Sequence, residues 1–138
     1  MLKRMSISTA IVFAVTSEAA LAGALSDNEI SQKILGSWVV PTTSTDYVPN
    51  SNYVVETFRP DGTYIATVYQ SADCKVRLQQ AQVLWSVQSG VLISTFPNGG
   101  GSKDQVESID AKIMTLHSLD DGSTYTRAKS EVCGKSVS

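Results

Sequence analysis

Residues able to catalyse a reaction are few in this sequence of 138 residues, which contains one histidine. A serine nucleophile needs a histidine base beside it, and the histidine, His117, follows Leu116, which we expect to face inward. Because neighbouring residues of a strand point to opposite faces, His117 is expected on the outer surface. The acids Asp120 and Asp121 lie in a turn sequence, where aspartate is favoured for its local hydrogen bonds. We therefore predict no catalytic residue and no enzyme activity.

Metal, cofactor and nucleic-acid sites are not indicated either. A zinc site usually takes four ligands, which one histidine and two distant cysteines do not supply. The three glycines at 99–101 are not followed by the lysine and helix of a phosphate-binding loop. The 11 Lys and Arg residues balance 13 Asp and Glu residues without forming a basic stripe, so binding to nucleic acid is not expected. We predict no metal and no cofactor.

Glu56 is the residue with the clearest chemical interest. The turn sequence RPDGT at residues 59–63 predicts a three-residue hairpin that pairs Glu56 with Ala66. The same hairpin pairs Phe58 with Tyr64 and Val54 with Val68. Since residues two apart in a strand share a face, Glu56 is expected to point inward with these apolar neighbours.

An inward carboxylate is costly unless it has a partner. The structural interpretation, which we favour, is an internal salt bridge from Glu56 to Arg77 or Arg127, or a different register that leaves Glu56 in solvent. The functional interpretation is a polar anchor for the head group of a ligand. The predicted ligand-contacting residues are this glutamate and four aromatic residues, namely Glu56, Tyr64, Trp85, Tyr125 and Tyr47.

The first 22 residues resemble a secretory signal peptide. Lys3 and Arg4 precede the apolar run 5–15, and Ala20-Leu21-Ala22 supplies a cleavage site before Gly23. The run is too short for a membrane anchor, and Ala24 stands where a lipoprotein would carry its lipidated cysteine. We expect a periplasmic or secreted chain with 9 basic and 12 acidic residues, a net charge of −3.

The two cysteines, Cys74 and Cys133, would then meet an oxidising compartment, where a disulfide persists. They lack the C-x-x-C spacing of a redox pair. A structural disulfide is therefore predicted, and it would tie the tail 130–138 to the domain.

One helix and eight strands are predicted in the mature chain. Ser26 and Glu29 form a capping box, Ile30 and Ile34 share one face, and Gly36 offers a stop. Eight short segments rich in β-branched and aromatic residues follow, separated by Gly-containing turns: Gly36–Val40, Tyr53–Arg59, Thr63–Gln70, Gln82–Val87, Val91–Phe96, Gln105–Ile109, Lys112–Leu119 and Ser123–Lys129. No helices lie between them to build parallel crossovers, so the sheet should be antiparallel.

Two further turns set the expected pairing of the later strands. Ser89-Gly90 aligns Val87 with Leu92 and Trp85 with Ser94. Asp121-Gly122, taken as a two-residue turn, aligns Leu116 with Arg127 and Ser118 with Tyr125. Residues 71–81 give no clear pattern.

These pieces resemble a small bacterial lipocalin-like domain, of the calycin group of up-and-down barrels. The resemblance is carried by the Gly-x-Trp opening at residues 35–40 (LGSWVV) after a short helix, and by the three hairpins in order. It covers most of residues 26–129 and implies an all-β, antiparallel, eight-stranded up-and-down barrel with a short N-terminal helix. It also implies that Trp38 packs at the barrel base with Arg127 lying across it, a structural pair supported by cation–π attraction.

The resemblance does not specify a ligand. It implies that the loop 42–52 overhangs the barrel mouth, where Tyr47 could belong to a lid, to a surface for a protein partner, or to a solvated connection. The bulky inward residues Phe58, Tyr64, Trp85 and Tyr125 favour a filled or shallow cavity.

The organisation expected from all this is a signal peptide (1–22), a helical arm (23–35), the barrel (36–129) and the tail (130–138). The predicted function is binding of a small, partly apolar molecule in the barrel mouth by a monomer without a membrane anchor. The alternative is a periplasmic protein-binding module, similar to a protease or lysozyme inhibitor, with a filled barrel.

Overall fold

The structure, a computed structural model, describes residues 24–131 and 133. The predicted signal peptide and its cleavage site lie outside the described residues. One helix, α1 (Asp27–Lys33), precedes eight strands: β1 (Gly36–Val39), β2 (Tyr53–Phe58), β3 (Thr63–Tyr69), β4 (Arg77–Gln88), β5 (Val91–Thr95), β6 (Gly101–Ile109), β7 (Ile113–Ser118) and β8 (Thr124–Lys129). No helix among the described residues has the length and apolar character needed to cross a membrane.

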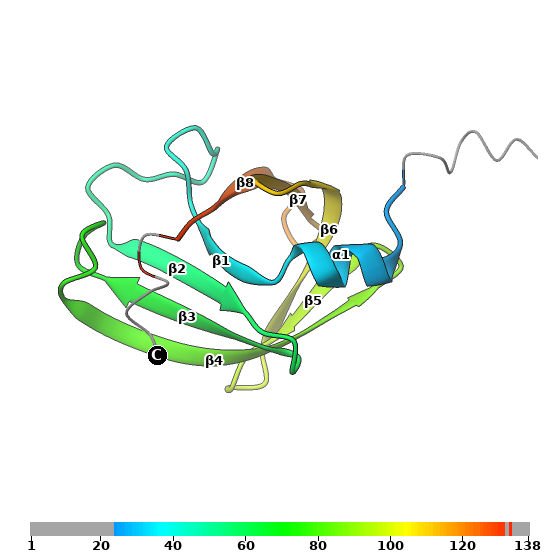
Figure 1. Cartoon of the computed structure of the whole chain (residues 1–138), viewed down its shortest axis with the longest axis horizontal. Coiled ribbons are helices and arrows are strands. Elements are labelled where there is room, and N and C mark those ends of the chain that lie inside the picture. Colours follow the sequence, from blue (N-terminus) through cyan, green and yellow to red (C-terminus); the bar gives the residue numbers. More distant parts are fainter. Residues whose placement is uncertain (1–23, 132, 134–138) are drawn as a thin grey trace, which may run out of the picture.

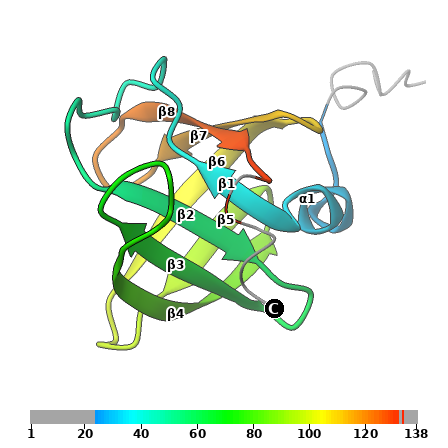
Figure 2. The ribbon, with the colours of Figure 1, turned by 60° about the vertical axis from the view of Figure 1, so that its left-hand side comes forward.

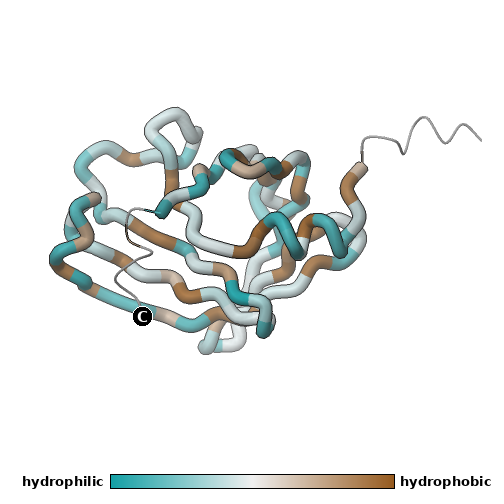
Figure 3. The backbone as a smooth tube through the Cα atoms, viewed as in Figure 1, coloured by the Kyte–Doolittle hydropathy of each residue, from teal (hydrophilic) through white to brown (hydrophobic). Residues whose placement is uncertain are grey.

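The strands form a closed antiparallel barrel in which each strand pairs with its neighbours in the sequence and β8 returns to β1 (Figures 1 and 2). The predicted all-β, up-and-down, eight-stranded architecture is confirmed. Apolar and polar residues are interspersed along the strands (Figure 3), as expected when one face of each strand lines the interior. Two strands begin earlier than predicted: β4 begins at Arg77 instead of Gln82, and β6 begins at Gly101 instead of Gln105.

Helix α1 covers one end of the barrel, which we call the closed end (Figure 1). The hydroxyl of Ser26 accepts a hydrogen bond from the backbone N–H of Glu29, as the capping sequence predicts. The helix ends at Lys33, before the glycine predicted to stop it. Ile30 and Ile34 are buried in the main apolar core, which confirms that they share the packed face.

The first two predicted hairpins have the expected register. Glu56 lies opposite Ala66, and Trp85 lies opposite Ser94. Ser89 and Gly90 both have positive φ angles, of 51° and 77°, which is the backbone conformation that a tight two-residue hairpin requires. Glu56 therefore faces the barrel interior, as predicted.

The last hairpin differs from the prediction by two residues. Leu116 lies opposite Tyr125, and Arg127 lies opposite Met114. The connection is a five-residue loop, closed by the backbone N–H of Ser118 donating to the carbonyl of Ser123. A shift of two residues keeps each side chain on its predicted face but moves it along the barrel. His117 stays on the outer face, where its Nδ1 lies 3.0 Å from the hydroxyl of Thr124.

This shift changes the partner of Trp38. Trp38 is fully buried at the closed end, and its indole N–H donates to the carbonyl of Ile34 at 2.7 Å. The cation over its ring is Lys129, with Nζ 4.7 Å from the ring centre, and not Arg127 as the resemblance implied. The same ammonium donates to the carbonyl of Leu35.

Gly36 begins β1 with a φ of 110°, where any other residue would be strained. A Cβ atom at Gly36 would also lie 2.9 Å from the Lys129 side chain. The glycine of the Gly-x-Trp motif therefore leaves room for the lysine that covers the tryptophan.

Cys74 and Cys133 form the predicted disulfide. Cys133 is buried on the outer face of the barrel with Val55 and Tyr69. The bond therefore ties the loop between β3 and β4 to the segment after β8. A disulfide is typical of proteins in a non-reducing environment.

Candidate functional site: a polar chain at the barrel mouth

The end of the barrel opposite α1, which we call the mouth, carries the connections β1–β2 and β3–β4 side by side (Figures 1 and 2). Between them lies a cavity of about 610 Å³, which we call the mouth hollow. Half of its lining residues are aliphatic or aromatic, and Asp46 is the one charged residue among them. The full lining is Val40, Asp46, Tyr47, Val48, Asn50, Ser51, Asn52, Tyr53, Val54, Gln70, Ser71 and Ala72.

The β1–β2 loop is fixed on one side by contacts with β8. The pairing between β1 and β8 is short, and the loop side chains continue it: the hydroxyl of Ser44 accepts from the backbone N–H of Thr126 at 3.0 Å, and the hydroxyl of Thr45 donates to the carbonyl of Thr124. Ser44 also donates to Asp46. The start of the loop is therefore part of the barrel wall, whereas Val48 beyond it is 60% exposed.

Asp46 connects the mouth hollow to polar side chains inside the barrel. Its Oδ2 lies 2.8 Å from Nη1 of Arg127, and Nε of Arg127 lies 3.9 Å from Oε2 of Glu56. We call these three side chains the polar chain. The guanidinium carbon of Arg127 also lies 4.4 Å from the centre of the Tyr125 ring, which favours a cation at this position.

Asp104 lies beside the polar chain on the inward face of β6. It is 6% exposed, and it is hydrogen-bonded by Tyr125 and Ser102. Burial raises the pKa of Asp104, and the hydrogen bonds from Tyr125 and Ser102 oppose that shift. Burial also raises the pKa of Tyr125, and the Asp104 carboxylate adds to the rise. Tyr125 is therefore a neutral hydrogen-bond donor at physiological pH.

Glu56 is enclosed by the barrel but stays in contact with water, because its side chain is 27% exposed. Burial raises its pKa, Arg127 lowers it, and the carboxylates of Asp104 and Asp46 raise it further. Among the described residues Arg127 is the one cation within 4 Å of Glu56. Arg77, the other predicted partner, instead donates to Gln80 at 2.8 Å on the exposed surface.

The remaining predicted ligand-contacting residues are divided between the mouth and the closed end. Tyr47 lines the mouth hollow. Tyr64 packs against Phe58 with ring centres 4.7 Å apart, and burial raises its pKa to about 12. Trp85 packs edge-on against Phe58, and its indole N–H donates to the carbonyl of Thr63. Tyr64 and Trp85 therefore belong to the packed core and not to the lining of the mouth hollow.

Sequence reasoning missed Asp46 and Asp104. Asp104 could have been found by alternation, because it lies two residues before the inward Val106, but the predicted strand began at residue 105. Asp46 lies in an irregular loop, so no periodic pattern indicates its contact with a residue 81 positions away.

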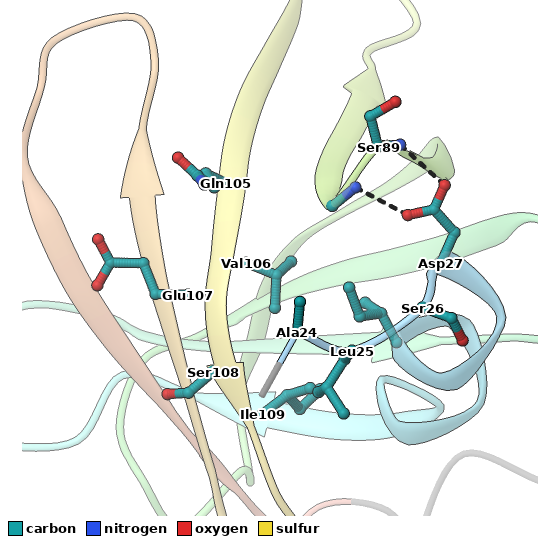
Figure 4. A pocket seen from close by; sticks show the side chains of 12 residues that line it. Ala24, Leu25, Ser26, Asp27, Ser89, Gln105, Val106, Glu107, Ser108 and Ile109 are labelled. Atoms are coloured by element: carbon teal, nitrogen blue, oxygen red, sulfur yellow. Dashed lines mark hydrogen bonds between the residues drawn. The ribbon is translucent and has the colours of Figure 1, made fainter. Parts of the chain in front are cut away.

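A larger hollow, of about 780 Å³, lies outside the barrel between the N-terminal segment, α1 and β6 (Figure 4). Its charged residue at the helix start, Asp27, accepts hydrogen bonds from the backbone N–H groups of Ser89 and Gly90, both at 2.8 Å. This carboxylate therefore fixes the helix to the β4–β5 turn. Of these two hollows, the mouth hollow is the one whose lining includes a residue of the polar chain, Asp46. We therefore take the mouth hollow as the candidate site.

Comparisons with protein-family models, with curated proteins and with solved structures found no match. Within residues 24–131 and 133, no three His, Cys, Asp or Glu side chains are grouped so that they could hold a metal ion. The closed eight-stranded barrel is consistent with a lipocalin-like fold.

Replacing Glu56 by glutamine is expected to leave the protein at least as stable as the original at neutral pH. A carboxyl group whose pKa is raised by folding contributes stability that is complete below its unfolded pKa and is lost as the pH rises through its folded pKa. Burial raises the pKa of Glu56 in this way. The unfolding free energies of the two proteins should therefore differ most at neutral pH and converge as the pH falls through the raised pKa of Glu56.

Denaturant unfolding at neutral pH and at lower pH measures this difference. Glu107→Gln, at an exposed position of β6, is the control for the loss of one charge. The sequence favoured a structural salt bridge, whose loss would cost about 3–5 kcal/mol. In the structure Arg127 also lies 2.8 Å from Asp46, so neutralising Glu56 would not leave the guanidinium without a carboxylate partner. A loss of several kcal/mol in Glu56→Gln at neutral pH would show that the longer contact with Glu56 is the important one.

Proposed function

We propose that the protein is an exported binding module that holds a small, partly apolar molecule in the mouth hollow. The observation that carries this proposal is the cavity of about 610 Å³ beneath the β1–β2 loop, with Val40, Val48 and Val54 in its lining. Binding sites for small molecules are concave, mainly apolar, and have a few polar groups that orient the ligand. The mouth hollow is concave, half of its lining residues are aliphatic or aromatic, and one polar residue of its lining, Asp46, belongs to the polar chain.

The packed closed end of the barrel supports the proposal that the ligand binds at the mouth. Trp38, Phe58, Met114 and Leu116 fill the half of the barrel nearest α1, so this half is a rigid base. Export is supported by the N-terminal sequence of the chain and by the disulfide. A ligand would therefore enter from the mouth and contact the loop residues first.

Filling the mouth hollow is expected to abolish binding without unfolding the barrel. Val54 is a half-buried residue of β2 that lines the hollow, so Val54→Trp would occupy the ligand's space. N-phenylnaphthylamine, an uncharged apolar dye that fluoresces when bound, serves as the probe. We expect saturable fluorescence with the original protein and at least about tenfold weaker binding with Val54→Trp, a loss of about 1.4 kcal/mol or more.

The matched control is Leu84→Trp, which adds the same side chain at an exposed position of β4 outside the hollow. It should bind the dye as the original protein does. Circular dichroism and thermal unfolding confirm that both variants fold. Equal dye binding by all three proteins would place the apolar site elsewhere, and no binding by any of them would contradict the proposed function.

One observation favours the alternative, a protein-binding module. The loop that covers the hollow exposes Tyr47 and Val48, and the closed half of the barrel is filled. Exposed apolar side chains on a loop held at its base are suited to contact a partner protein. A partner protein that docks on the exposed loop would still be captured by Val54→Trp, which fills the hollow beneath the loop, whereas a small molecule held in the hollow would not bind to that variant; this difference distinguishes the two functions.

A further inference from the structure

The charges around the mouth hollow are unequal. The lining contains no lysine or arginine, and its one charged residue is Asp46, whose side chain is 38% exposed. Two more carboxylates, Glu56 and Asp104, lie behind it on inward faces of the barrel. Within the part of the chain that the structure describes, these three acids interact with one guanidinium, that of Arg127.

The guanidinium of Arg127 lies closer to Asp46 than to Glu56. Its Nη1 donates to Asp46 and also to the backbone carbonyl of Thr126 at 2.9 Å, and its carbon lies over the ring of Tyr125. Lys129, the other inward cation, is held at the closed end by Trp38 and the Leu35 carbonyl. Neither cation therefore makes a close ion pair with Glu56.

Glu56 adds a second negative charge behind Asp46, with which its carboxylate interacts. It keeps one long contact, 3.9 Å to Nε of Arg127, and its side chain is 27% exposed inside an enclosing barrel. A charge in such surroundings interacts more strongly with an added opposite charge than it would on an open surface, because less water screens the pair. Asp46 in the lining and Glu56 behind it therefore both attract a cation to this side of the hollow.

We propose that the mouth hollow selects an amphiphilic cation, a molecule with an apolar chain and an ammonium head group. The chain would contact the valines and tyrosines of the lining, and the head group would lie at Asp46, on the side of its carboxylate away from Arg127, with Glu56 adding negative charge behind it. An ammonium group supplies three donors and a positive charge, which matches two carboxylates that share one arginine. This inference rests on the proposed function and specifies the ligand class of the same site.

The inference is tested with three molecules that share one alkyl chain and differ in head group: octylammonium, octanol and octanoate. Their affinities for the purified protein are measured by displacement of N-phenylnaphthylamine and by calorimetry at neutral pH. We expect octylammonium to bind at least about tenfold more tightly than octanol, as a charged hydrogen bond in a partly enclosed site allows. Octanoate should bind most weakly.

Variants of opposite expected sign identify the residues responsible. Glu56→Gln should reduce the ratio of octylammonium to octanol affinity severalfold, and Asp46→Asn should do the same. Arg127→Gln should increase the ratio, because it removes the internal cation that competes for both acids. Glu107→Gln removes an acid that is exposed on β6, outside the mouth hollow, and should leave the ratio unchanged. Since the ratio compares two ligands on one protein, a partial loss of fold does not mimic the effect.

The outcomes separate this inference from the proposed function. Tight octanol binding with no preference for octylammonium would overturn the cation inference and leave the binding module intact. A preference that survives both Glu56→Gln and Asp46→Asn would also overturn it. Failure of octylammonium, octanol and the dye to bind the original protein would overturn both proposals together.

Discussion

Trp38→Ala is expected to destabilise the protein by about 3–5 kcal/mol, the cost typical of removing a large aromatic side chain from a core. Trp38 is fully buried where β1 meets the closed end. Its ring supports the Lys129 ammonium, and its indole N–H is bonded to the carbonyl of Ile34 at the end of α1. The substitution therefore leaves a cavity, an unpaired carbonyl and a partly buried lysine without its aromatic surface.

The loss is measured by thermal and denaturant unfolding, and it corresponds to a fall in Tm of about 10 °C or more for a domain of this size. Trp38→Phe is the matched control, because it keeps an aromatic ring and removes the indole hydrogen bond. It should lie between the original protein and the alanine variant, with a cost of about 1–3 kcal/mol. An unchanged Tm in Trp38→Ala would mean that the Gly-x-Trp segment does not anchor the closed end.

Local sequence signals predicted most of the barrel, because hairpin turns and side-chain alternation are short-range properties. The Pro-Asp-Gly turn placed Glu56 opposite Ala66, and alternation then placed its side chain inside. The capping sequence at Ser26 likewise predicted the start of α1. In each case the residues that determine the geometry lie within a few positions of one another.

The wrong register predicted for the last hairpin shows a limit of reasoning from local turn sequences. Asp121-Gly122 has the sequence of a two-residue turn, but the hydroxyl of Ser118 accepts hydrogen bonds from the backbone N–H groups of Asp120 and Asp121. These contacts stabilise a longer loop and move β8 by two residues relative to β7. As a result Lys129 meets Trp38, and Arg127 lies nearer the mouth, where Asp46 binds it.

The candidate site was only partly predictable for a related reason. Glu56 belongs to a regular strand, so its direction follows from its neighbours. Asp46 reaches Arg127 because Ser44 and Thr45 attach an irregular loop to β8, and that attachment joins residues about 80 positions apart. Tertiary contacts of this kind leave no periodic trace in the sequence.

Removal of the Cys74–Cys133 disulfide is the second change for which we expect a large effect. The bond joins residues 59 positions apart. In the chain-entropy model, closing a loop of this length restricts the unfolded chain enough to stabilise the folded protein by about 4 kcal/mol. The double variant with Cys74→Ser and Cys133→Ser should therefore unfold at a substantially lower denaturant concentration than the oxidised original protein.

A chemical control distinguishes the effect of losing the disulfide from the effect of replacing the cysteine side chains. The original protein, reduced and alkylated under native conditions, should lose stability comparable to that of the double variant, and the double variant should not respond to reductant. Intact-mass analysis of the protein taken from the exporting cell tests the same bond directly. Two alkylatable thiols without reduction would contradict the disulfide, and a mass that includes residues 1–22 would contradict removal of the signal peptide.

The disulfide also has a local role that distinguishes it from a general constraint on the unfolded chain. Cys74 lies in the β3–β4 connection, whose residues Ser71 and Ala72 line the mouth hollow. Cys133 is buried against Val55 and Tyr69, so the bond holds that connection to the outer wall of β2 and β3. If this attachment positions the wall of the hollow, reduction should weaken dye and octylammonium binding at temperatures where the barrel remains folded. Unchanged affinity in the folded, reduced protein would show that the bond stabilises the barrel without shaping the site.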